Sequence, residues 1–413
     1  MKKALALLLA LVMVFALAAC GQQAAAPAAA PAAAPAGDAA PAAAPAGEEV
    51  IKIGYVSDLT GGTALWGNAG KYGAEMAVEE INAAGGVLGG KKLQLVAMDG
   101  KGEAADSVNA LRKLITDEGI VAEIGTNFSS CNIPMAAVAD EMKVPIIGTA
   151  ASNELVTVDE NGKLHPYSFR MCFIDSYLGT VMGTYATKNL GLTKAALFTV
   201  AGNTNSESVG AFVKDAFVAN GGTIVSEEQC QEADVDFRAQ LAKIKAAEPE
   251  VIFVMMNDYA KNATFAKQAR EMGIDCLLMG HDGWDSQQLA AEAQGALEGC
   301  KYVSRIGFSK PEAKEFGEKV AAKYNIGMEA ECLFGWDGVH WIVDAIERAG
   351  SADPTAIRDA LEATDVFNGL IGTLVMNSET HNPVMACEVF EFQTNEAGEH
   401  IKVPIKTVDA VTD

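Results

Sequence analysis

Histidine is scarce in this chain, and the motifs that carry the common enzymatic chemistries are missing. Only five histidines occur among 413 residues. The sequence contains no GxSxG nucleophile elbow, no HExxH pair and no GxxxxGK[ST] phosphate loop. His281 is the one histidine in a candidate site loop, and we interpret it as a residue that shapes a strand end, because no nucleophile adjoins it. We therefore expect no enzymatic activity, no catalytic residue and no cofactor.

Cysteine pairs with metal-binding spacing are also missing. No CxxC pair occurs and no cysteine lies beside a histidine suited to zinc, so we expect no metal site. Besides Cys20, the chain has seven cysteines: Cys131, Cys172, Cys230, Cys276, Cys300, Cys332 and Cys387. We interpret them as buried free thiols. If a disulfide forms, Cys276 with Cys300 is the best candidate, because each heads a predicted strand in the same expected lobe. The odd count leaves at least one thiol of the chain unpaired.

Basic residues are much fewer than acidic ones. The chain has 31 Lys and Arg against 54 Asp and Glu, a formal net charge of −23. Nucleic acids and anionic lipid surfaces are bound through basic patches. This composition argues against both kinds of partner, and it says little about a small ligand.

The apolar run at the start of the chain is too short to span a membrane. It follows Lys2 and Lys3, covers the 16 residues 4–19 and ends in small residues before Cys20, whereas a span needs about 20 residues. Residues 1–20 resemble a bacterial lipoprotein signal, with lipidation at Cys20 and the body anchored on the outer face of the cell membrane. The alternative, an uncleaved membrane anchor, also places the body outside.

Residues 21–47 read as a tether. Between 24 and 47, 16 of 24 residues are alanine and five are proline. Prolines at this spacing favour a semi-rigid extended spacer. The 366 residues that follow exceed the roughly 250–300 at which single hydrophobic cores stop growing, so we expect two lobes.

Short β-branched runs alternate with amphipathic stretches along this body. This rhythm predicts an α/β fold with parallel sheets and helices on both faces. The predicted strands are 50–59, 93–99, 121–125, 144–148, 195–200, 222–227, 251–256, 276–280 and 300–305. The predicted helices include 71–84, 103–117, 133–143, 208–220, 237–247, 259–272, 311–324, 332–349 and 354–363, before strand-like segments between 372 and 407.

The loops that follow the predicted strands are unusually polar and aromatic. In open parallel sheets, ligands bind beyond the carboxyl ends of the strands. Helix capping explains part of this polarity, but we still expect the site here. The loops are 60–67, 126–130, 149–153, 257–259 and 281–284.

Several stretches together resemble one known family, the class I periplasmic binding proteins of ABC importers, in its leucine/isoleucine/valine-binding branch. The likeness runs from Val50 to about Ser378. The stretches are IKIG (51–54), GG (61–62), WG (66–67), GAEMAV (73–78), INAAGG (81–86), IG (124–125), SS (129–130), VPII (144–147), AAS (150–152), QAREMG (268–273) and MG (279–280).

The resemblance implies two doubly wound parallel-sheet lobes that close on a ligand and are joined by three crossovers. We place the crossovers near Arg170, near Ser304 and at 366–372. Lobe 1 then comprises 48–170 plus 306–365. Lobe 2 comprises 171–305 plus 366–413.

The same resemblance implies the ligand contacts. The positions that bind an amino acid's carboxylate in the family match Ser129, Ala150 and Ser152. Hydroxyls and free N–H groups at a helix start form a neutral anion site; Ser129 also fits as a plain N-cap, but two such loops favour a ligand. Asp282 matches the acidic residue that binds the α-ammonium, and Trp66 matches the aromatic residue of the side-chain pocket.

The chain departs from the family where two tyrosines usually contact the ligand. Asn205 and Asp258, or its neighbour Tyr259, occupy those positions. If Asp258 faces the cleft beside Asp282, one carboxylate stays unpaired with a plain leucine. That arrangement favours a ligand with an extra cationic or amide group, or a proton shared between the carboxylates.

Phe128 and Trp284 are expected to add apolar or cation-binding walls. The implied function is a monomeric receptor that delivers a branched-chain or related amino acid or amide to the permease and ATPase of an ABC importer. An alternative output is a membrane signalling receptor. An enzyme that uses paired aspartates is disfavoured, because nucleophile and metal signals are absent, and a purely structural lipoprotein would bind no ligand.

Overall fold

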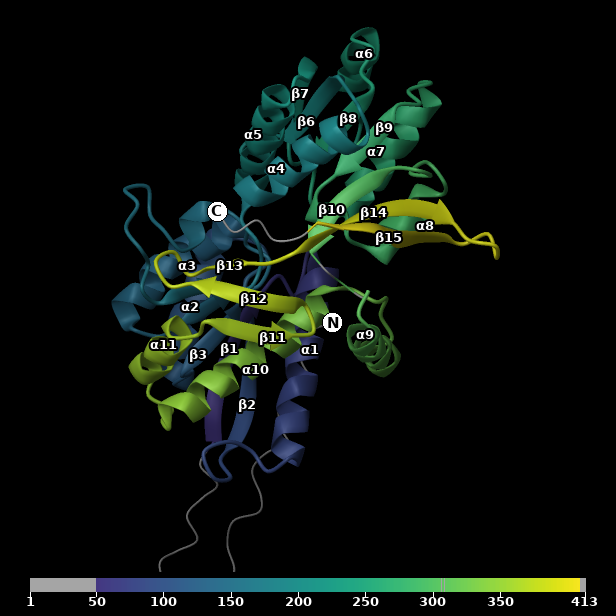
Figure 1. The fold of residues 1–413 in the computed structure, drawn as a ribbon. Helices are drawn as coiled ribbons and strands as arrows, with labels where there is room; N and C mark the ends of the chain where they lie inside the picture. The colour runs from purple at the N-terminus through teal and green to yellow at the C-terminus, as the bar shows by residue number, and fades with distance from the viewer. Residues whose placement is uncertain (1–49, 306, 308, 409–413) are drawn as a thin grey trace, which may run out of the picture. The chain divides into compact units, whose positions relative to one another are not determined.

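A computed structural model of the protein describes residues 50–305, 307 and 309–408. The predicted signal with Cys20 and the tether at 21–47 lie outside the described residues. Within the described part, the chain forms two large sheets and one small one (Figure 1).

The first sheet is parallel and has the strand order β2-β1-β3-β4-β5. Its strands are β1 (Val50–Ser57), β2 (Lys92–Asp99), β3 (Ala122–Gly125), β4 (Ile146–Gly148) and β5 (Ser168–Arg170). Its helices are α1 (Ala64–Ala83), α2 (Ala104–Lys113), α3 (Ser129–Met142), α9 (Pro311–Tyr324), α10 (Glu331–Ala349) and α11 (Pro354–Glu362), with a π turn η1 (Leu114–Glu118) and a 3-10 turn η2 (Glu154–Val156).

Both faces of this sheet are covered. Tyr55 and Ile124 pack in one core cluster with residues of α1 and α10. Val56 and Ile146 pack in a second cluster with residues of α2 and α3. Because both faces are covered, every residue of β3 and β4 is buried; β4 is entirely apolar, and β3 is apolar except for the buried Glu123. We call this sheet with its helices lobe 1.

The second sheet has the order β15-β14-β10-β9-β8-β6-β7. Its parallel strands are β6 (Lys194–Val200), β7 (Thr223–Cys230), β8 (Val251–Met255), β9 (Leu277–Gly280) and β10 (Lys301–Arg305), and its antiparallel strands are β14 (Cys387–Thr394) and β15 (His400–Val408). Its helices are α4 (Asp175–Thr184), α5 (Thr204–Ala219), α6 (Arg238–Ala246), α7 (Tyr259–Glu271) and α8 (Gln287–Ala293), with a π turn η3 (Tyr185–Asn189) and a 3-10 turn η4 (Asp282–Trp284).

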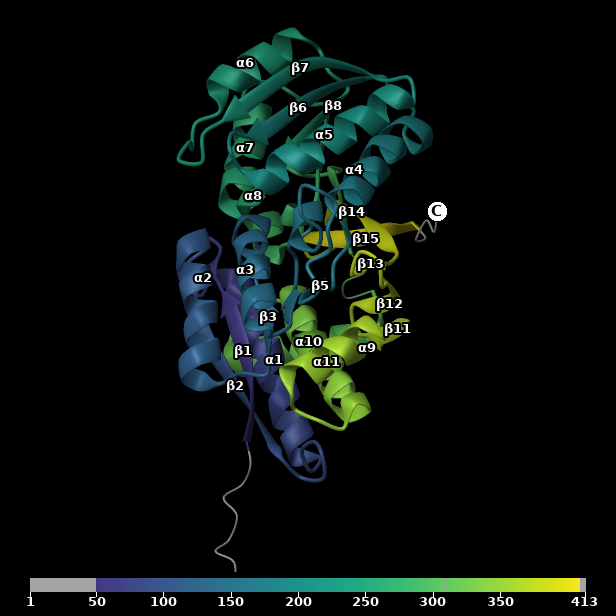
Figure 2. The same ribbon diagram turned by 90° about the vertical axis from the view of Figure 1, so that its left-hand side faces the viewer.

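Neighbouring residues of β6 point to opposite faces of this sheet. Leu197 belongs to a core cluster that includes residues of α4 and α5, and Phe198 belongs to a cluster with residues of α6 and α7. Helices α4 and α5 lie side by side on one face in both views (Figures 1 and 2). This sheet with its helices is lobe 2, and both lobes are doubly wound as expected.

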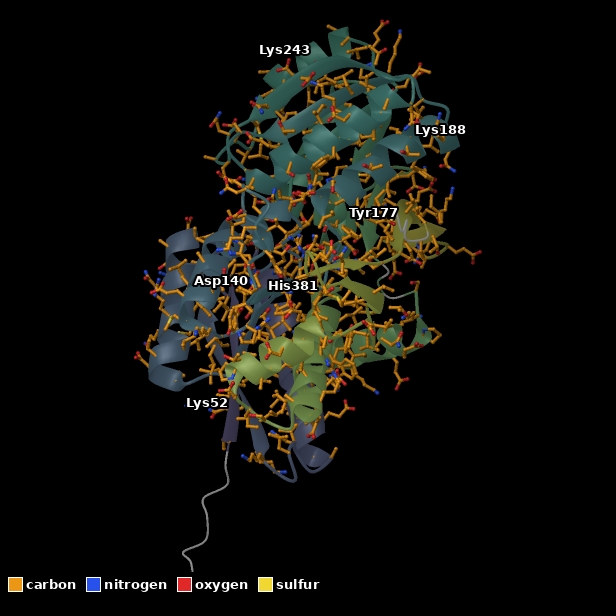
Figure 3. The ribbon with its side chains drawn as sticks, turned by 60° about the vertical axis from the view of Figure 1, so that its left-hand side comes forward. Lys52, Asp140, Tyr177, Lys188, Lys243 and His381 are labelled. Carbon is orange, nitrogen blue, oxygen red and sulfur yellow. The ribbon has the colours of Figure 1, made fainter. Side chains whose placement is uncertain are left out.

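A small antiparallel sheet, β11 (Val366–Gly369), β12 (Gly372–Asn377) and β13 (Asn382–Val384), corrects the predicted third crossover. Asp337 of α10 accepts hydrogen bonds from the N–H groups of Leu370 and Ile371, both at 2.8 Å. His381, which is labelled in Figure 3, stacks on Phe169 with ring centroids 4.1 Å apart. Residues 366–384 therefore pack on lobe 1, and the chain enters lobe 2 between β13 and β14, not at 366–372.

Close contact between α1 and α10 brings two site elements together. A Cβ at Gly73 would lie 1.8 Å from the carbonyl oxygen of Cys332, and one at Gly335 would lie 1.8 Å from that of Gly70. Only glycine permits this approach. The helix starts that carry Trp66 and Glu331 consequently meet at the same place.

All seven cysteines of the described body are free. The proposed Cys276–Cys300 disulfide is therefore not formed. The Cys300 thiol instead accepts a hydrogen bond from the Arg270 guanidinium at 3.1 Å.

Candidate functional site

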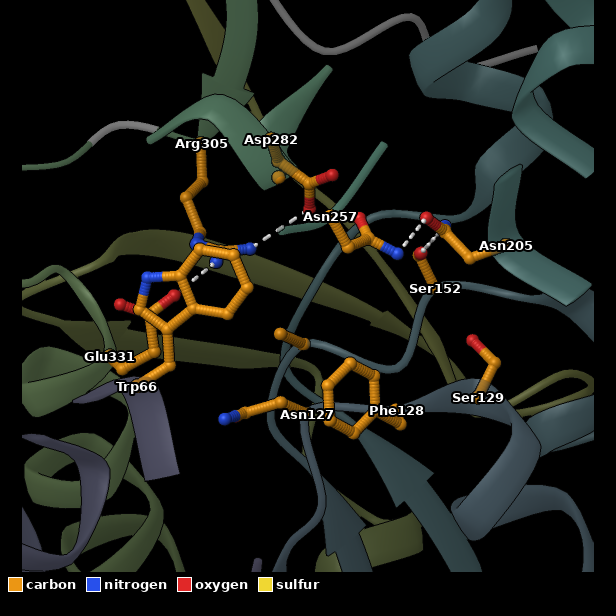
Figure 4. A pocket seen from close by; sticks show the side chains of 12 residues that line it. Trp66, Asn127, Phe128, Ser129, Ser152, Asn205, Asn257, Asp282, Arg305 and Glu331 are labelled. Carbon is orange, nitrogen blue, oxygen red and sulfur yellow. Dashed lines mark hydrogen bonds and ion pairs between the residues drawn. The ribbon is translucent and has the colours of Figure 1, made fainter. Parts of the chain in front are cut away.

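A pocket with a volume of about 440 Å³, counting the space open to solvent, lies between the strand-end loops of both lobes. Figure 4 shows it from close by. Its lining residues are Trp66, Asn127, Phe128, Ser129, Ala150, Ser152, Asn205, Asn257, Asp282, Gly283, Arg305 and Glu331.

One wall is the start of α3, with Ser129 as its first residue. The preceding residue, Phe128, has no side-chain oxygen and makes no capping hydrogen bond. The Ser129 hydroxyl accepts a hydrogen bond from the Asn153 N–H at 3.1 Å, so its own proton is free to be donated. A helix start without a side-chain cap offers N–H groups to an anion. This wall can therefore hold a carboxylate without a protein cation.

Asn205 links the two lobes beside this wall. Its amide nitrogen donates to the Ser152 hydroxyl and to the Asp175 carboxylate, each at 3.0 Å. Its amide oxygen accepts a hydrogen bond from Asn257 at 3.1 Å, and Figure 4 shows the chain Asn257, Asn205, Ser152. Burial raises the pKa of Asp175 to about 6, although a hydrogen bond with Ser152 opposes this rise. These contacts fix the orientation of each amide.

The opposite wall carries a buried charge cluster. Arg305, at the end of β10, forms an ion pair with Asp282 at 3.2 Å and a second with Glu331 at 3.0 Å. Nδ1 of His281 lies 2.9 Å from the Asp282 carboxylate. The exposed fractions of the side chains are 2% for Arg305, 9% for Asp282 and 7% for Glu331.

The pKa values of Asp282 and Glu331 are shifted in opposite directions from their usual values. Burial raises the pKa of Asp282, but the hydrogen bond with His281 and the charge of Arg305 outweigh it, so the net pKa lies below the usual value. For Glu331, burial wins over the attraction of Arg305 and raises the pKa. Asp282 is thus held ionised. When Glu331 is ionised as well, the wall holds two carboxylates and one guanidinium, and this net negative charge suits one cation.

Aromatic rings close the pocket. Trp66, in the first turn of α1, is 6% exposed. Its ring meets that of Tyr259, at the start of α7, edge-on with centroids 6.0 Å apart. This contact joins lobe 1 to lobe 2.

Seven of the nine predicted ligand residues line the pocket: Trp66, Phe128, Ser129, Ala150, Ser152, Asn205 and Asp282. Asp258 and Trp284 do not. The Asp258 carboxylate caps α7, accepting hydrogen bonds from the N–H groups of Ala260 and Lys261 at 2.9 and 3.0 Å. Trp284 is fully buried in the core of lobe 2, with its ring 6.2 Å from that of Phe392. The second carboxylate of the site is Glu331, not Asp258.

Five lining residues were not predicted: Asn127, Asn257, Gly283, Arg305 and Glu331. The first three lie in the loops 126–130, 257–259 and 281–284, which the sequence already marked as site loops, so their position in these loops was the signal that could have identified them. Arg305 and Glu331 flank the second crossover, where no local motif marks them. His281 contacts Asp282 and lies outside the lining, fully buried.

Among the residues placed in the structure, no group of three or more His, Cys, Asp and Glu side chains could hold a metal ion. No helix of residues 50–305, 307 and 309–408 is both long and apolar enough to cross a membrane.

Comparisons with known proteins agree on one family. The model of a family described as "Periplasmic binding protein" matches residues 50–398. The Leu/Ile/Val-binding protein homolog 3 of Brucella melitensis is 31% identical over 332 residues, which covers 80% of this chain and 88% of that protein.

Two solved structures share the fold. The leucine binding protein LivK of Thermotoga maritima matches with a TM-score of 0.78 and 29% identity, covering 87% of this chain and 99% of its own. LivJ of Streptococcus pneumoniae, a branched-chain amino acid transporter substrate binding protein in complex with isoleucine, matches with a TM-score of 0.77 and 28% identity, covering 86% and 100%.

Proposed function

Because this chain belongs to the periplasmic binding protein family, we propose that it is the extracytoplasmic receptor of an ABC importer and that its pocket holds a free α-amino acid. The family and the relatives named above are substrate-binding receptors rather than enzymes. The proposal concerns the ligand, the delivery step and the lipid anchor at Cys20, which lies outside the described residues.

This proposal rests on the two opposite walls of the pocket, one of which suits an anion and the other a cation. Ser129 offers its hydroxyl at the start of α3, next to Ser152, and the pocket lining on this wall contains no cationic side chain. Asp282 offers a buried, ionised carboxylate on the other wall. An α-amino acid bears an anion and a cation on the same carbon, and it satisfies both walls at once. An ion pair in a closed, water-poor site is stronger than one at the surface.

Delivery would rest on lobe closure. A ligand that contacts Ser129 of lobe 1 and Asp282 of lobe 2 binds the closed form better than the open one, and it shifts the population toward closure. The permease and ATPase of the importer would then recognise the closed receptor, which acts as a monomer held to the membrane by its lipid.

The test is isothermal titration calorimetry on residues 48–413, unfolded and refolded to remove any carried-over ligand. We expect saturable binding of at least one α-amino acid with a Kd of about 1 μM or below, which corresponds to about −8 kcal/mol. The control ligands lack one charge: an amine without the carboxylate and a carboxylate without the amine. The absence of binding by any amino acid would overturn the proposal.

Ser129→Ala is expected to weaken amino acid binding by about tenfold or more, because a hydrogen bond to a charged group contributes about 1.5–3 kcal/mol. Calorimetry measures the loss. The matched control is Ser130→Ala, which removes the exposed neighbouring hydroxyl on the same helix. If Ser129→Ala weakens an amine without a carboxylate as much as an amino acid, then Ser129 is a structural residue that holds the Asn153 N–H.

A further inference from the structure

Three polar atoms in the pocket lining are buried and have no hydrogen-bond partner. They are Nε1 of Trp66, Nε of Arg305 and Oε2 of Glu331. The three residues are 6%, 2% and 6% exposed. In Figure 4 they group on one side of the pocket, away from Ser129, Ser152 and Asn205. Buried polar groups in native proteins are nearly always paired, so this group calls for a ligand that supplies the missing partners.

The donor or acceptor character of these three atoms limits which ligand could pair with them. Trp66 Nε1–H and Arg305 Nε–H are donors, and Glu331 Oε2 in its ionised form is an acceptor. An aliphatic side chain would leave all three unpaired. A carboxamide carries an oxygen that accepts hydrogen bonds and an NH₂ group that donates them, and it complements both kinds of atom.

The charges of this wall distinguish a neutral carboxamide side chain from a basic or an acidic one. The wall holds two carboxylates and one guanidinium. The ligand's α-ammonium supplies the one missing positive charge, while the α-carboxylate lies at the neutral start of α3. A basic side chain would then face Arg305, and an acidic one would face Glu331 and Asp282. The side chain that leaves the charges balanced is neutral.

We propose that the ligand is an α-amino acid with a carboxamide side chain, recognised by Trp66, Arg305 and Glu331. This inference rests on the proposed amino acid function. It assigns Trp66 and Glu331 the role of specificity residues: Trp66 Nε1 and Arg305 Nε donate to the amide oxygen, and Glu331 Oε2 accepts from the amide nitrogen.

The first experiment compares ligands on the refolded wild-type protein by calorimetry. Methionine has nearly the length of glutamine without its amide, and leucine stands for the aliphatic class. We expect glutamine or asparagine to bind at least about tenfold more tightly than methionine, leucine, glutamate and lysine, because a site built for hydrogen bonds rejects analogues that lack them. Equal or tighter binding of leucine or methionine would overturn this inference and leave the amino acid function standing. No binding of any amino acid would overturn both.

Two variants test the assigned roles. Trp66→Phe keeps an aromatic wall and removes the indole N–H, so the ratio of glutamine to methionine affinity should fall by about tenfold. Glu331→Gln keeps the shape and removes one negative charge beside Arg305, so the ratio of glutamate to glutamine affinity should rise by about tenfold or more. Unfolding curves confirm that each variant is folded. Unchanged ratios in both folded variants would overturn the assignment.

Discussion

Asp282→Asn is expected to weaken the binding of every α-amino acid by between about 30-fold and several thousand-fold, since truncating one member of a buried charge pair costs about 2–5 kcal/mol. The carboxylate is buried and ionised, with a lowered pKa. Asparagine keeps the shape and loses the charge that is proposed to face the ligand's α-ammonium. Calorimetry against the best amino acid of the panel measures the effect, and denaturant unfolding of the ligand-free protein reports any loss of stability.

Asp258→Asn is the matched control for this change. Asp258 caps α7 and lies outside the pocket lining, and asparagine caps helices about as well as aspartate. We expect its affinity to stay within about threefold of the wild type, a change below 1 kcal/mol. Equal losses in the two variants, or no loss in Asp282→Asn, would remove Asp282 from the ammonium site.

Glu329→Gln is expected to stabilise the protein at alkaline pH. Glu329 precedes α10, is 1% exposed and has one carboxylate oxygen without a partner. Burial raises its pKa to about 8; the charge of Lys402 opposes this rise, while Glu331 and Asp285 add to it. The folded state therefore binds this proton more tightly than the unfolded state does. The stability from the protonated carboxyl is complete below the unfolded pKa of 4.5 and is lost as pH rises to about 8.

Glutamine resembles the protonated carboxyl at every pH. The variant should match the wild type near pH 4 and exceed it near pH 8.5 by on the order of 5 kcal/mol, because each pKa unit corresponds to about 1.4 kcal/mol. Urea unfolding at the two pH values measures this difference. Glu396→Gln, at an exposed turn between β14 and β15, is the control with no such trend. A gain of equal size at both pH values, or no gain, would contradict the prediction.

Much of the fold was predictable because local sequence determines it. All nine predicted strands are present, from β1 to β10 with the exception of β5. Buried parallel strands need continuous apolar runs, and these runs stand out between amphipathic helices. The site loops were predictable for a related reason: the carboxyl ends of parallel strands meet at one edge, so polar loops far apart in sequence lie together.

The predictions failed where a residue or strand finds its packing or hydrogen-bonding partner in a distant part of the chain, which local sequence does not encode. A strand such as β12, in which buried and exposed residues alternate, has the same sequence pattern whether it packs on lobe 1 or on lobe 2, so the third crossover was misplaced. Asp258 and Asp282 both follow strands, but one carboxylate faces the N–H groups of its own helix and the other faces Arg305. Glu331 reaches the pocket through the glycine contact of α1 with α10, which only the folded chain reveals.

The hydrogen bonds that Asn205 makes to Ser152 and that Asp175 receives from Asn153, at 3.0 and 3.3 Å, join the lobes with protein groups alone. If the receptor closes around its ligand as proposed, these bonds also favour the closed form without ligand, and an importer that recognises only shape would then receive unloaded receptors. Such a receptor gains affinity, because less of the ligand's binding energy is spent on closure. The difference in closed population between the loaded and the empty receptor becomes smaller. Under the proposed function, the Asn205–Ser152 hydrogen bond would therefore determine how well the closed form distinguishes a loaded receptor from an empty one.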